Sequence, residues 1–288
     1  LNATGTNGYA NAGALSLAAI ETLSIVTNDS DTTAATTMFD LNLDAVNTTS
    51  ITVTGDAGIT FANSSYTALR TMDASGVTAT GAAGVVTFTA IAGADTVIKG
   101  GAGNDALTGN TGADTITGGA GANALVGGGG ADTITGGGVI DTITGGTGAD
   151  TMTGGAGNDI FVVADGDSLT TGSDSITDYT AGDVVRLQTG DSVAGVSATA
   201  GVVATSNVQV AAGGKVTFAA ADDTLAEQLV AIAADVTDIG TNEVAFFEFG
   251  GDTYIFNNVG GADDLVKLVG VTGMTTISEA VAGDFTIA

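Results

Sequence analysis

Residues 100–162 read GGAGNDALT, GNTGADTIT, GGAGANALV, GGGGADTIT, GGGVIDTIT, GGTGADTMT and GGAGNDIFV, which are seven consecutive units of nine residues. The eighth position of every unit is a large apolar residue. The sixth position is acidic in all units but the third: Asp105, Asp114, Asn123, Asp132, Asp141, Asp150 and Asp159. A flexible linker has no reason to keep an apolar residue at one position through seven units, so the stretch predicts regular structure.

The repeat length predicts a parallel β-solenoid. One large apolar residue in nine cannot be buried by its own unit, because its neighbours on a short strand point the other way. Two units are therefore expected to make one turn, with the apolar residues of opposite strands meeting inside. Units two apart then stack on the same edge, which puts their sixth-position carboxylates about 4.8 Å apart.

Such stacking creates an electrostatic problem. Two bare carboxylates about 5 Å apart repel by roughly 3 kcal/mol at an effective dielectric constant of about 20. No basic residue lies between Lys99 and Arg186 to offset this repulsion. Ca²⁺ offsets it, because it takes carboxylate and backbone carbonyl oxygens as ligands, and glycine corners leave carbonyls accessible. We therefore expect folding of this segment to be coupled to calcium.

The irregular units are not scattered. Asn123 replaces the sixth-position Asp of the third unit, and Val139 replaces the fourth-position Gly of the fifth. Both lie in odd-numbered units and hence on one edge, whereas the even-numbered units deviate only at Asn110. The hypothesis from this pattern is that the even edge holds calcium more regularly or more tightly than the odd edge.

Composition excludes several functions. Among 288 residues there are 32 acidic and five basic ones, a net charge of −27, and no His, Cys, Trp or Pro. Without His or Cys the chain cannot build a Ser-His-Asp triad, a Cys-His nucleophile or a thiolate metal site. Five cations cannot neutralise a phosphate backbone, so no nucleic-acid partner is expected. The apolar runs are interrupted, so no membrane insertion is expected. Because residue 1 is Leu and no signal peptide is visible, the chain is expected to be a fragment or a processed form.

The flanks predict further β structure, which gives three domains: residues 1–90, 91–180 and 181–288. Residues 51–54, 59–61 and 86–89 alternate apolar residues with Thr, which is typical of half-buried strands. We expect them to form further solenoid turns with longer and less regular loops. After the array, Asp165, Asp167, Asp178 and Asp183 either bind additional calcium or lie in solvated turns.

The C-terminal segment predicts one helix and one hairpin. Leu225, Leu229, Ile232 and Val236 share one face of an amphipathic helix over residues 223–236. Residues 244–249 and 253–256 flank Gly250-Gly251-Asp252, which predicts a hairpin with aromatic-rich strands. The expected fold class is thus all-β, a parallel β-solenoid flanked by β-rich domains, with about one short helix near the C-terminus.

The array resembles the RTX proteins, bacterial proteins exported by type I secretion, whose repeats form a calcium-binding β-roll. The resemblance implies several Ca²⁺ ions bound through the sixth-position side chains given above. It extends to Asp95, in a weaker unit with Val97, and to Asp174, in a fading unit with Gly172 and Ile176. It also implies carbonyl ligands from the glycines of the array: Gly100, Gly101, Gly103, Gly109, Gly112, Gly118, Gly119, Gly121, Gly127, Gly128, Gly130, Gly136, Gly137, Gly145, Gly146, Gly148, Gly154, Gly155 and Gly157.

The same resemblance suggests a function. The ending Asp284-Phe285-Thr286-Ile287 looks like the uncleaved C-terminal export signal of part of that family, with Asp284, Phe285 and Ile287 as its key residues. The Thr-, Ala- and Gly-rich flanks are similar to RTX surface-layer proteins, which tile the bacterial cell surface as a calcium-dependent lattice. We therefore expect a secreted, non-enzymatic structural subunit on the bacterial cell surface. Its expected partners are other copies of itself, the type I secretion machinery and a cell-surface polysaccharide.

Two other functions remain open. One is an RTX adhesin, which long tandem repeats upstream would favour. The other is the C-terminal export and folding portion of a secreted RTX enzyme, which an upstream catalytic domain would establish.

Overall fold

A computed structural model describes residues 2–5, 15–17, 19–29, 38–61, 64–91, 93–163, 172–187, 192–193, 208–210, 215–218, 243–258, 264–275, 277–281 and 284–287. The chain forms two compact units, one of Leu1–Gly146 with Thr153–Asp159 and the other of Thr147–Met152 with Ile160–Ala288. Both are built from strands, and the one helical element in the described ranges is the short 3-10 helix η1 (Ala82–Gly84). The helix expected over residues 223–236 lies outside the described residues, as do Asp165 and Asp167.

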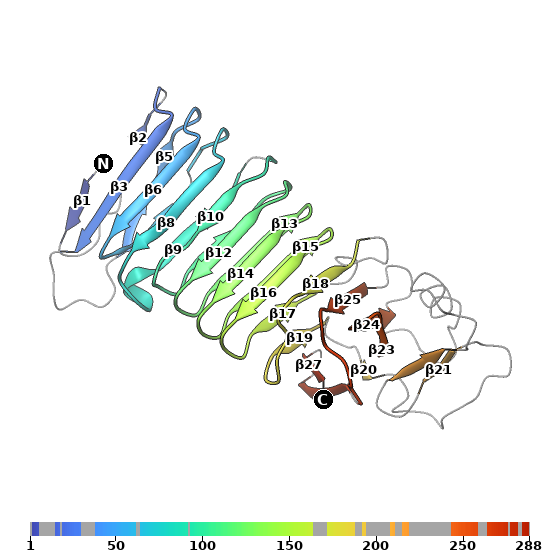
Figure 1. Ribbon diagram of the computed structural model, residues 1–288. Helices are drawn as coiled ribbons and strands as arrows, with labels where there is room; N and C mark the ends of the chain where they lie inside the picture. The colour runs from blue at the N-terminus through green and yellow to red at the C-terminus, as the bar shows by residue number, and fades with distance from the viewer. Residues whose placement is uncertain are drawn as a thin grey trace. The chain divides into compact units, whose positions relative to one another are not determined.

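The first unit is a parallel β-solenoid with two principal sheets, and its strands lie side by side in Figure 1. The first sheet contains, in spatial order, β1 (Asn2–Gly5), β3 (Thr22–Asp29), β6 (Ser50–Gly55), β8 (Thr71–Val77), β10 (Val97–Lys99), β12 (Thr115–Gly119) and β14 (Thr133–Gly137). The second contains β4 (Met38–Leu41), β7 (Gly58–Phe61), β9 (Val86–Thr89), β11 (Ala106–Thr108), β13 (Ala124–Gly129) and β15 (Thr142–Thr147). A small sheet pairs β2 (Leu15–Ser16) with β5 (Leu43–Asp44).

The repeat dictates the register of the solenoid. Ile116 on β12 pairs with Ile98 on one side and Ile134 on the other, and all three are at most 1% exposed. Leu107 and Leu125 pair in the same way in the second sheet. Because side chains alternate along a strand, the flanking Thr residues face outward. Two nonapeptides therefore make one turn and units two apart stack, as the sequence predicts.

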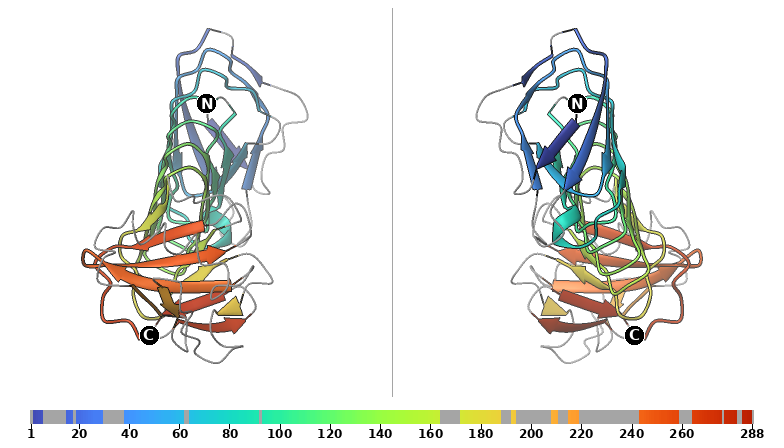
Figure 2. Two further views of the ribbon diagram at one scale, coloured as in Figure 1. Left: turned by 90° about the vertical axis from the view of Figure 1, so that its right-hand side faces the viewer. Right: turned by 90° about the vertical axis from the view of Figure 1, so that its left-hand side faces the viewer.

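Solenoid turns continue through the N-terminal part of the chain, where the expected strands form β6, β7 and β9. Figure 2 shows the turns of this unit nearly end-on, each following the outline of the one before it. Their interior is mainly aliphatic and includes one aromatic cluster, in which Tyr66 stacks on Phe88 with ring centroids 5.2 Å apart and Phe61 meets Phe88 edge to face at 5.7 Å. Side-chain hydroxyls bond the backbone across these turns, as Thr27 does to the carbonyl of Ala57 at 2.6 Å.

The unit before the array lies one residue later than expected. Ile98 is fully buried and pairs with Ile116, whereas Val97 is 36% exposed. Thr96, and not Asp95, occupies the buried place two residues before the apolar one. The expected register of this unit is therefore wrong. Counting back nine residues from Asp105 and Leu107 reaches Thr96 and Ile98, so this unit keeps the period of nine without an insertion.

The second unit combines parallel and antiparallel pairing. β16 (Thr151–Gly155), whose first two residues belong to this unit, pairs in parallel with β18 (Asp174–Ile176). The same sheet continues through β25 (Asp264–Leu268), β24 (Asp252–Asn258), β23 (Glu243–Phe249) and β20 (Ser192–Val193). A second sheet contains β17 (Ile160–Val162), β19 (Val184–Arg186), β27 (Asp284–Ile287) and β26 (Ile277–Val281). β21 (Val208–Val210) and β22 (Val216–Phe218) form a separate pair.

The predicted aromatic hairpin is present. β23 and β24 pair antiparallel around Gly250 and Gly251, whose φ angles of 65° and 96° suit a tight hairpin turn. Phe247 stacks on Tyr254 at 5.2 Å, and both side chains are buried in this unit. The described part of the chain contains no helix with the length and hydrophobicity needed to cross a bilayer.

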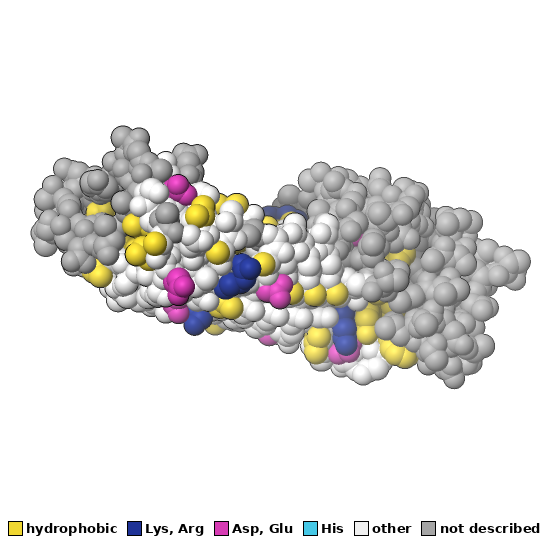
Figure 3. Space-filling view, turned by 90° about the horizontal axis from the view of Figure 1, so that it is seen from above, with side chains coloured by type: hydrophobic (Ala, Val, Ile, Leu, Met, Phe, Trp, Pro, Cys, Tyr) yellow, Lys and Arg dark blue, Asp and Glu magenta, His cyan; other side chains and the backbone are white. Residues whose placement is uncertain are grey.

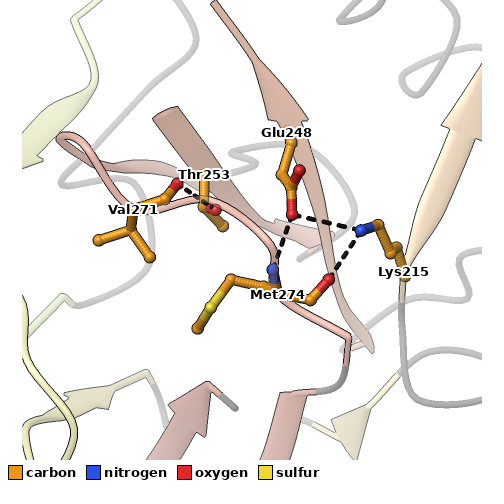
Figure 4. Close-up of polar contacts among 5 residues, drawn as sticks. All are labelled: Lys215, Glu248, Thr253, Val271 and Met274. Atoms are coloured by element: carbon orange, nitrogen blue, oxygen red, sulfur yellow. Dashed lines mark hydrogen bonds and ion pairs between the residues drawn. The ribbon is translucent and has the colours of Figure 1, made fainter. Parts of the chain in front are cut away.

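A polar cluster fixes the segment that follows β25 (Figure 4). The Lys215 ammonium lies 3.2 Å from Oε1 of Glu248 and donates to the carbonyl of Met274 at 2.7 Å. The Met274 N–H donates to the same Glu248 oxygen at 2.8 Å, and the Thr253 hydroxyl donates to the carbonyl of Val271 at 2.8 Å. These bonds hold residues 271–274 against β23 and β24, although the segment has no regular secondary structure.

The corrected register can be tested with two neighbouring substitutions. Ile98→Ala removes a fully buried side chain and is expected to lower the free energy of unfolding by about 2–5 kcal/mol. Val97→Ala trims an exposed one, so its effect is expected to stay within about 0.5 kcal/mol. Denaturant unfolding followed by circular dichroism in calcium measures both. A larger effect of Val97→Ala than of Ile98→Ala would instead support the register in which Asp95 and Val97 hold the sixth and eighth positions.

Candidate metal-binding corners

The sixth-position side chains of the array are buried at the corners of the solenoid. Each is at most 3% exposed, although seven of these eight residues, with Asp174 included, are carboxylic acids. Positions six and eight share the inward face because they are two residues apart on extended backbone. The repeat therefore buries one acidic and one apolar side chain in each regular unit.

In the odd-numbered units these side chains form a continuous hydrogen-bonded series, here called the odd row. Oδ1 of Asp105 accepts the N–H of Val86 at 2.7 Å, and the Asp105 N–H donates to Oδ1 of Asn123 at 2.9 Å. The Asn123 N–H donates to Oδ1 of Asp141 at 2.7 Å, and the Asp141 N–H to Oδ1 of Asp159 at 2.8 Å. Each side chain thus ties its own turn to the backbone of the preceding one.

The even-numbered repeats make the same hydrogen bond and are here called the even row, which has members in each of the two compact units. In the first, Oδ1 of Asp114 accepts the Thr96 N–H at 2.6 Å, and the Asp114 N–H donates to Oδ1 of Asp132 at 2.7 Å. In the second, the Asp150 N–H donates to Oδ1 of Asp174 at 3.0 Å. Asp174 therefore occupies the same kind of position as the regular sixth-position residues, as predicted from the fading unit with Gly172 and Ile176.

In five of the seven units the structure shows that the first glycine makes room for the carboxylate. A Cβ added to Gly136 would overlap Oδ2 of Asp141 and would lie 2.5 Å from the carbonyl oxygen of Gly154. Both oxygens therefore lie beside the same glycine. The pairing of a carboxylate Oδ2 with a glycine carbonyl recurs beside Gly100, Gly109 and Gly127, and Asp159 lies against Gly154 in the same way.

The other glycines serve the backbone itself. At the second position, Gly119, Gly128, Gly137, Gly146 and Gly155 have positive φ, and a Cβ on each would overlap a carbonyl of the preceding turn. At the fourth position the same holds for Gly121 and Gly130, and Gly148 and Gly157 also have positive φ. Gly101, Gly103 and Gly112, in the first two units, are required for close approach and not for positive φ. Gly118 and Gly145 are first-position glycines, and the Gly145 carbonyl faces Gly127.

Burial makes the ionised carboxylates unfavourable when no cation is bound. It raises the pKa of Asp105 to about 6 and that of Asp141 also to about 6, and the charge of Asp159 adds to the second shift. Burial likewise raises the pKa of Asp114. Among the described residues, Lys99 pairs with Asp73, Lys215 with Glu248 and Lys267 with Asp252, and all three acids lie outside both rows. On the face drawn in Figure 3, acidic side chains are few and scattered.

The oxygen atoms at these corners are of the kind that calcium binds. Oδ2 of Asp141 is inaccessible to solvent and accepts no hydrogen bond, although it lies near the Gly154 carbonyl. In the described residues no three acidic side chains converge on one point, so an ion here needs backbone carbonyls as well as a carboxylate. Calcium accepts such mixed oxygen ligands in flexible geometry. Bound there, it would supply the positive charge that the buried carboxylates need.

Asp95 and Asp183 lie outside the seven units of the array. Asp95 is exposed, and its Oδ1 accepts the Ala113 N–H at 3.0 Å. Contrary to the expectation from the sequence, it therefore does not occupy a buried corner. Asp183, which the sequence leaves open, is only 3% exposed and precedes β19 just as Asp159 precedes β17. Its Oδ2 accepts the Thr180 N–H at 2.6 Å. Asp284, Phe285 and Ile287 lie on β27, which pairs antiparallel with β19 and β26.

Comparison with known families identifies the repeats. Residues 99–134 and 135–169 match the family described as the RTX calcium-binding nonapeptide repeat (4 copies). No curated protein matches the chain significantly. The chain therefore contains RTX repeats of the calcium-binding kind, folded as a β-roll.

The raised pKa values predict an inverted pH dependence without calcium. Between the ordinary value of 3.8 and about 6, folded Asp105 and Asp141 bind more protons than the unfolded chain does. Stability in chelator is therefore expected to fall as pH rises through this window. In calcium the ion binds the ionised form, so stability is expected to rise with pH. Melting temperatures at pH 4.5–7, followed by circular dichroism, measure both trends, and Asp141→Asn should flatten the slope in chelator.

A matched glycine pair tests the carboxylate pocket. Gly136→Ala places a methyl group against Oδ2 of Asp141, so we expect calcium affinity to fall by about 10–100-fold. Gly138→Ala is the control, because a Cβ there meets no atom within 4 Å. Calorimetric titration with Ca²⁺ measures both affinities. Equal affinities would show that the pocket beside Gly136 is not part of an ion site.

Proposed function

We propose that the protein is a structural subunit of a bacterial surface layer, in which several Ca²⁺ ions fold the β-roll outside the cell and hold copies together in a two-dimensional lattice. The observation that carries the calcium-dependent part is the burial of carboxylates whose pKa is raised and which lie beside carbonyl oxygens. Ionised carboxylates at these corners are unfavourable without a countercharge, and a bound ion would stabilise them. Calcium concentration thereby becomes the switch for folding.

Folding after export follows from this coupling. A calcium-poor cell interior leaves the array unfavourable to fold, and an extended chain suits passage through a type I export channel. The proposed signal, Asp284-Phe285-Thr286-Ile287, becomes β27 in the folded unit and pairs with β19. It is therefore accessible as an extended segment before folding and incorporated into a sheet afterwards.

The net charge and the outward-facing residues support the proposed lattice. A net charge of −27 makes neighbouring copies repel until divalent ions screen or bridge their surfaces. The outward residues of the regular strands, such as Thr115, Thr117, Thr133 and Thr135, are uncharged and regularly spaced, which favours packing in a repeating array. Attachment to the cell is proposed to use a surface polysaccharide.

Two alternatives are compatible with the same β-roll. An RTX adhesin would use it as a calcium-stiffened stalk, and a secreted RTX enzyme would use it as its export and folding portion. The full-length reading frame separates them, because an adhesin requires long tandem repeats and an enzyme requires a catalytic domain upstream.

Calcium titration separates folding from assembly. Adding calcium to chelated protein is expected first to increase the β-sheet circular dichroism signal and then, at millimolar concentrations, to produce sheets visible by negative-stain electron microscopy. Mg²⁺ at the same concentration is the control, because it prefers a smaller octahedral site. A folded protein that stays monomeric in millimolar calcium would contradict the lattice. An unchanged dichroism signal after calcium removal would contradict the coupling.

A further inference from the structure

Asn123 is the one neutral residue at the sixth position of the array, and its amide has a fixed orientation. Its Oδ1 accepts the Asp105 N–H at 2.9 Å. Since a backbone N–H can only donate, the amide oxygen must face Asp105 and the NH₂ group must face the other way. There Nδ2 donates to the carbonyl of Gly121 at 3.0 Å.

The NH₂ group of Asn123 takes the place that a carboxylate oxygen has elsewhere. A Cβ on Gly118 would lie 2.6 Å from Nδ2 of Asn123 and 2.7 Å from the Gly136 carbonyl. At the equivalent Gly127, the neighbouring atoms are Oδ2 of Asp132 and the Gly145 carbonyl. The Asn123 corner therefore presents polar hydrogens where the other corners present a carboxylate oxygen.

The start of the even row has a comparable amide. Nδ2 of Asn110 lies 3.1 Å from the Ala94 carbonyl, 3.2 Å from the Thr96 hydroxyl and 3.4 Å from Oδ1 of Asp114. Its oxygen accepts the N–H groups of Thr111 and Gly112, which fixes the orientation of this amide too. Three oxygen atoms thus lie around the neutral NH₂ group of Asn110, in the way that oxygen ligands lie around an ion.

We propose that the Asn123 amide replaces a metal ion at its corner, so that the odd row carries a cation-free site between Asp105 and Asp141. The amide supplies partial positive charge to the Gly121 carbonyl and adds no negative charge of its own. An ion placed beside Gly118 would instead meet the NH₂ hydrogens and would lose its carboxylate ligand. This inference rests on the proposed calcium binding of the other corners.

Asn123→Asp is the direct test, with Asn104→Asp as its control. Asn104 is exposed on the same edge, so both variants make the same chemical change and only one makes it in a corner. Asn123→Asp is expected to bind about one more Ca²⁺ per chain than the unmodified protein, because it restores a carboxylate ligand. In chelator it is expected to melt at a lower temperature than Asn104→Asp, since it buries another charge and loses the bond to Gly121. Atomic emission on gel-filtered protein counts the ions.

Equal ion counts in the two folded variants would overturn the inference. If Asn123→Asp does not fold, anomalous diffraction from calcium-loaded crystals of the unmodified protein gives the answer. Ions at other corners and none beside Gly118 would support the proposal, whereas an ion beside Gly118 would overturn it. Absence of ions from every corner would overturn the proposed calcium-dependent function itself, so the two failures can be told apart.

Discussion

The burial of carboxylates at the corners of the β-roll is the constraint on which the rest of the structure depends. An ionised acid removed from water needs hydrogen bonds, a countercharge or a proton. Asp105 and Asp141 receive backbone N–H donors, yet burial still raises the pKa of each to about 6. The solenoid is thus closed by groups whose charge the polypeptide alone does not balance, which makes its stability responsive to dissolved cations.

The composition of the repeat follows from the same constraint. A side chain at the first position would occupy the space of the carboxylate, as at Gly136, and one at the second position would overlap the preceding turn, as at Gly137. Between these corners only one apolar residue per unit, such as Ile134, reaches the interior. The hydrophobic contribution of each unit is therefore small, and neighbouring units must stabilise one another, as in other repeat proteins.

Much of this arrangement could be predicted from the sequence, because a strict period of nine fixes strand pairing, inward residues and the stacking of Asp114 on Asp132. The register at Asp95 was wrong because the acidic residue lies one position before the buried place, which the period of nine assigns to Thr96, with Ile98 as the apolar residue. The role of the first-position glycines could not be predicted, since it depends on where Oδ2 of an Asp five residues later lies. The orientation of the Asn123 amide likewise follows only from its partners in space.

The N-terminal turns differ from the repeats in what closes their corners. Hydroxyl groups do this work there, from Thr27 to the Ala57 carbonyl, from Thr48 to the Ile20 carbonyl and from Tyr66 to the Thr89 carbonyl. Such bonds involve no metal ion, so chelators are not expected to weaken them, and the Tyr66 ring also stacks on Phe88. The β-roll accordingly continues from paired strands that need no ion at their corners. Under the proposed coupling to calcium, ordering of the repeats would extend this existing sheet edge and would not need a separate nucleation step.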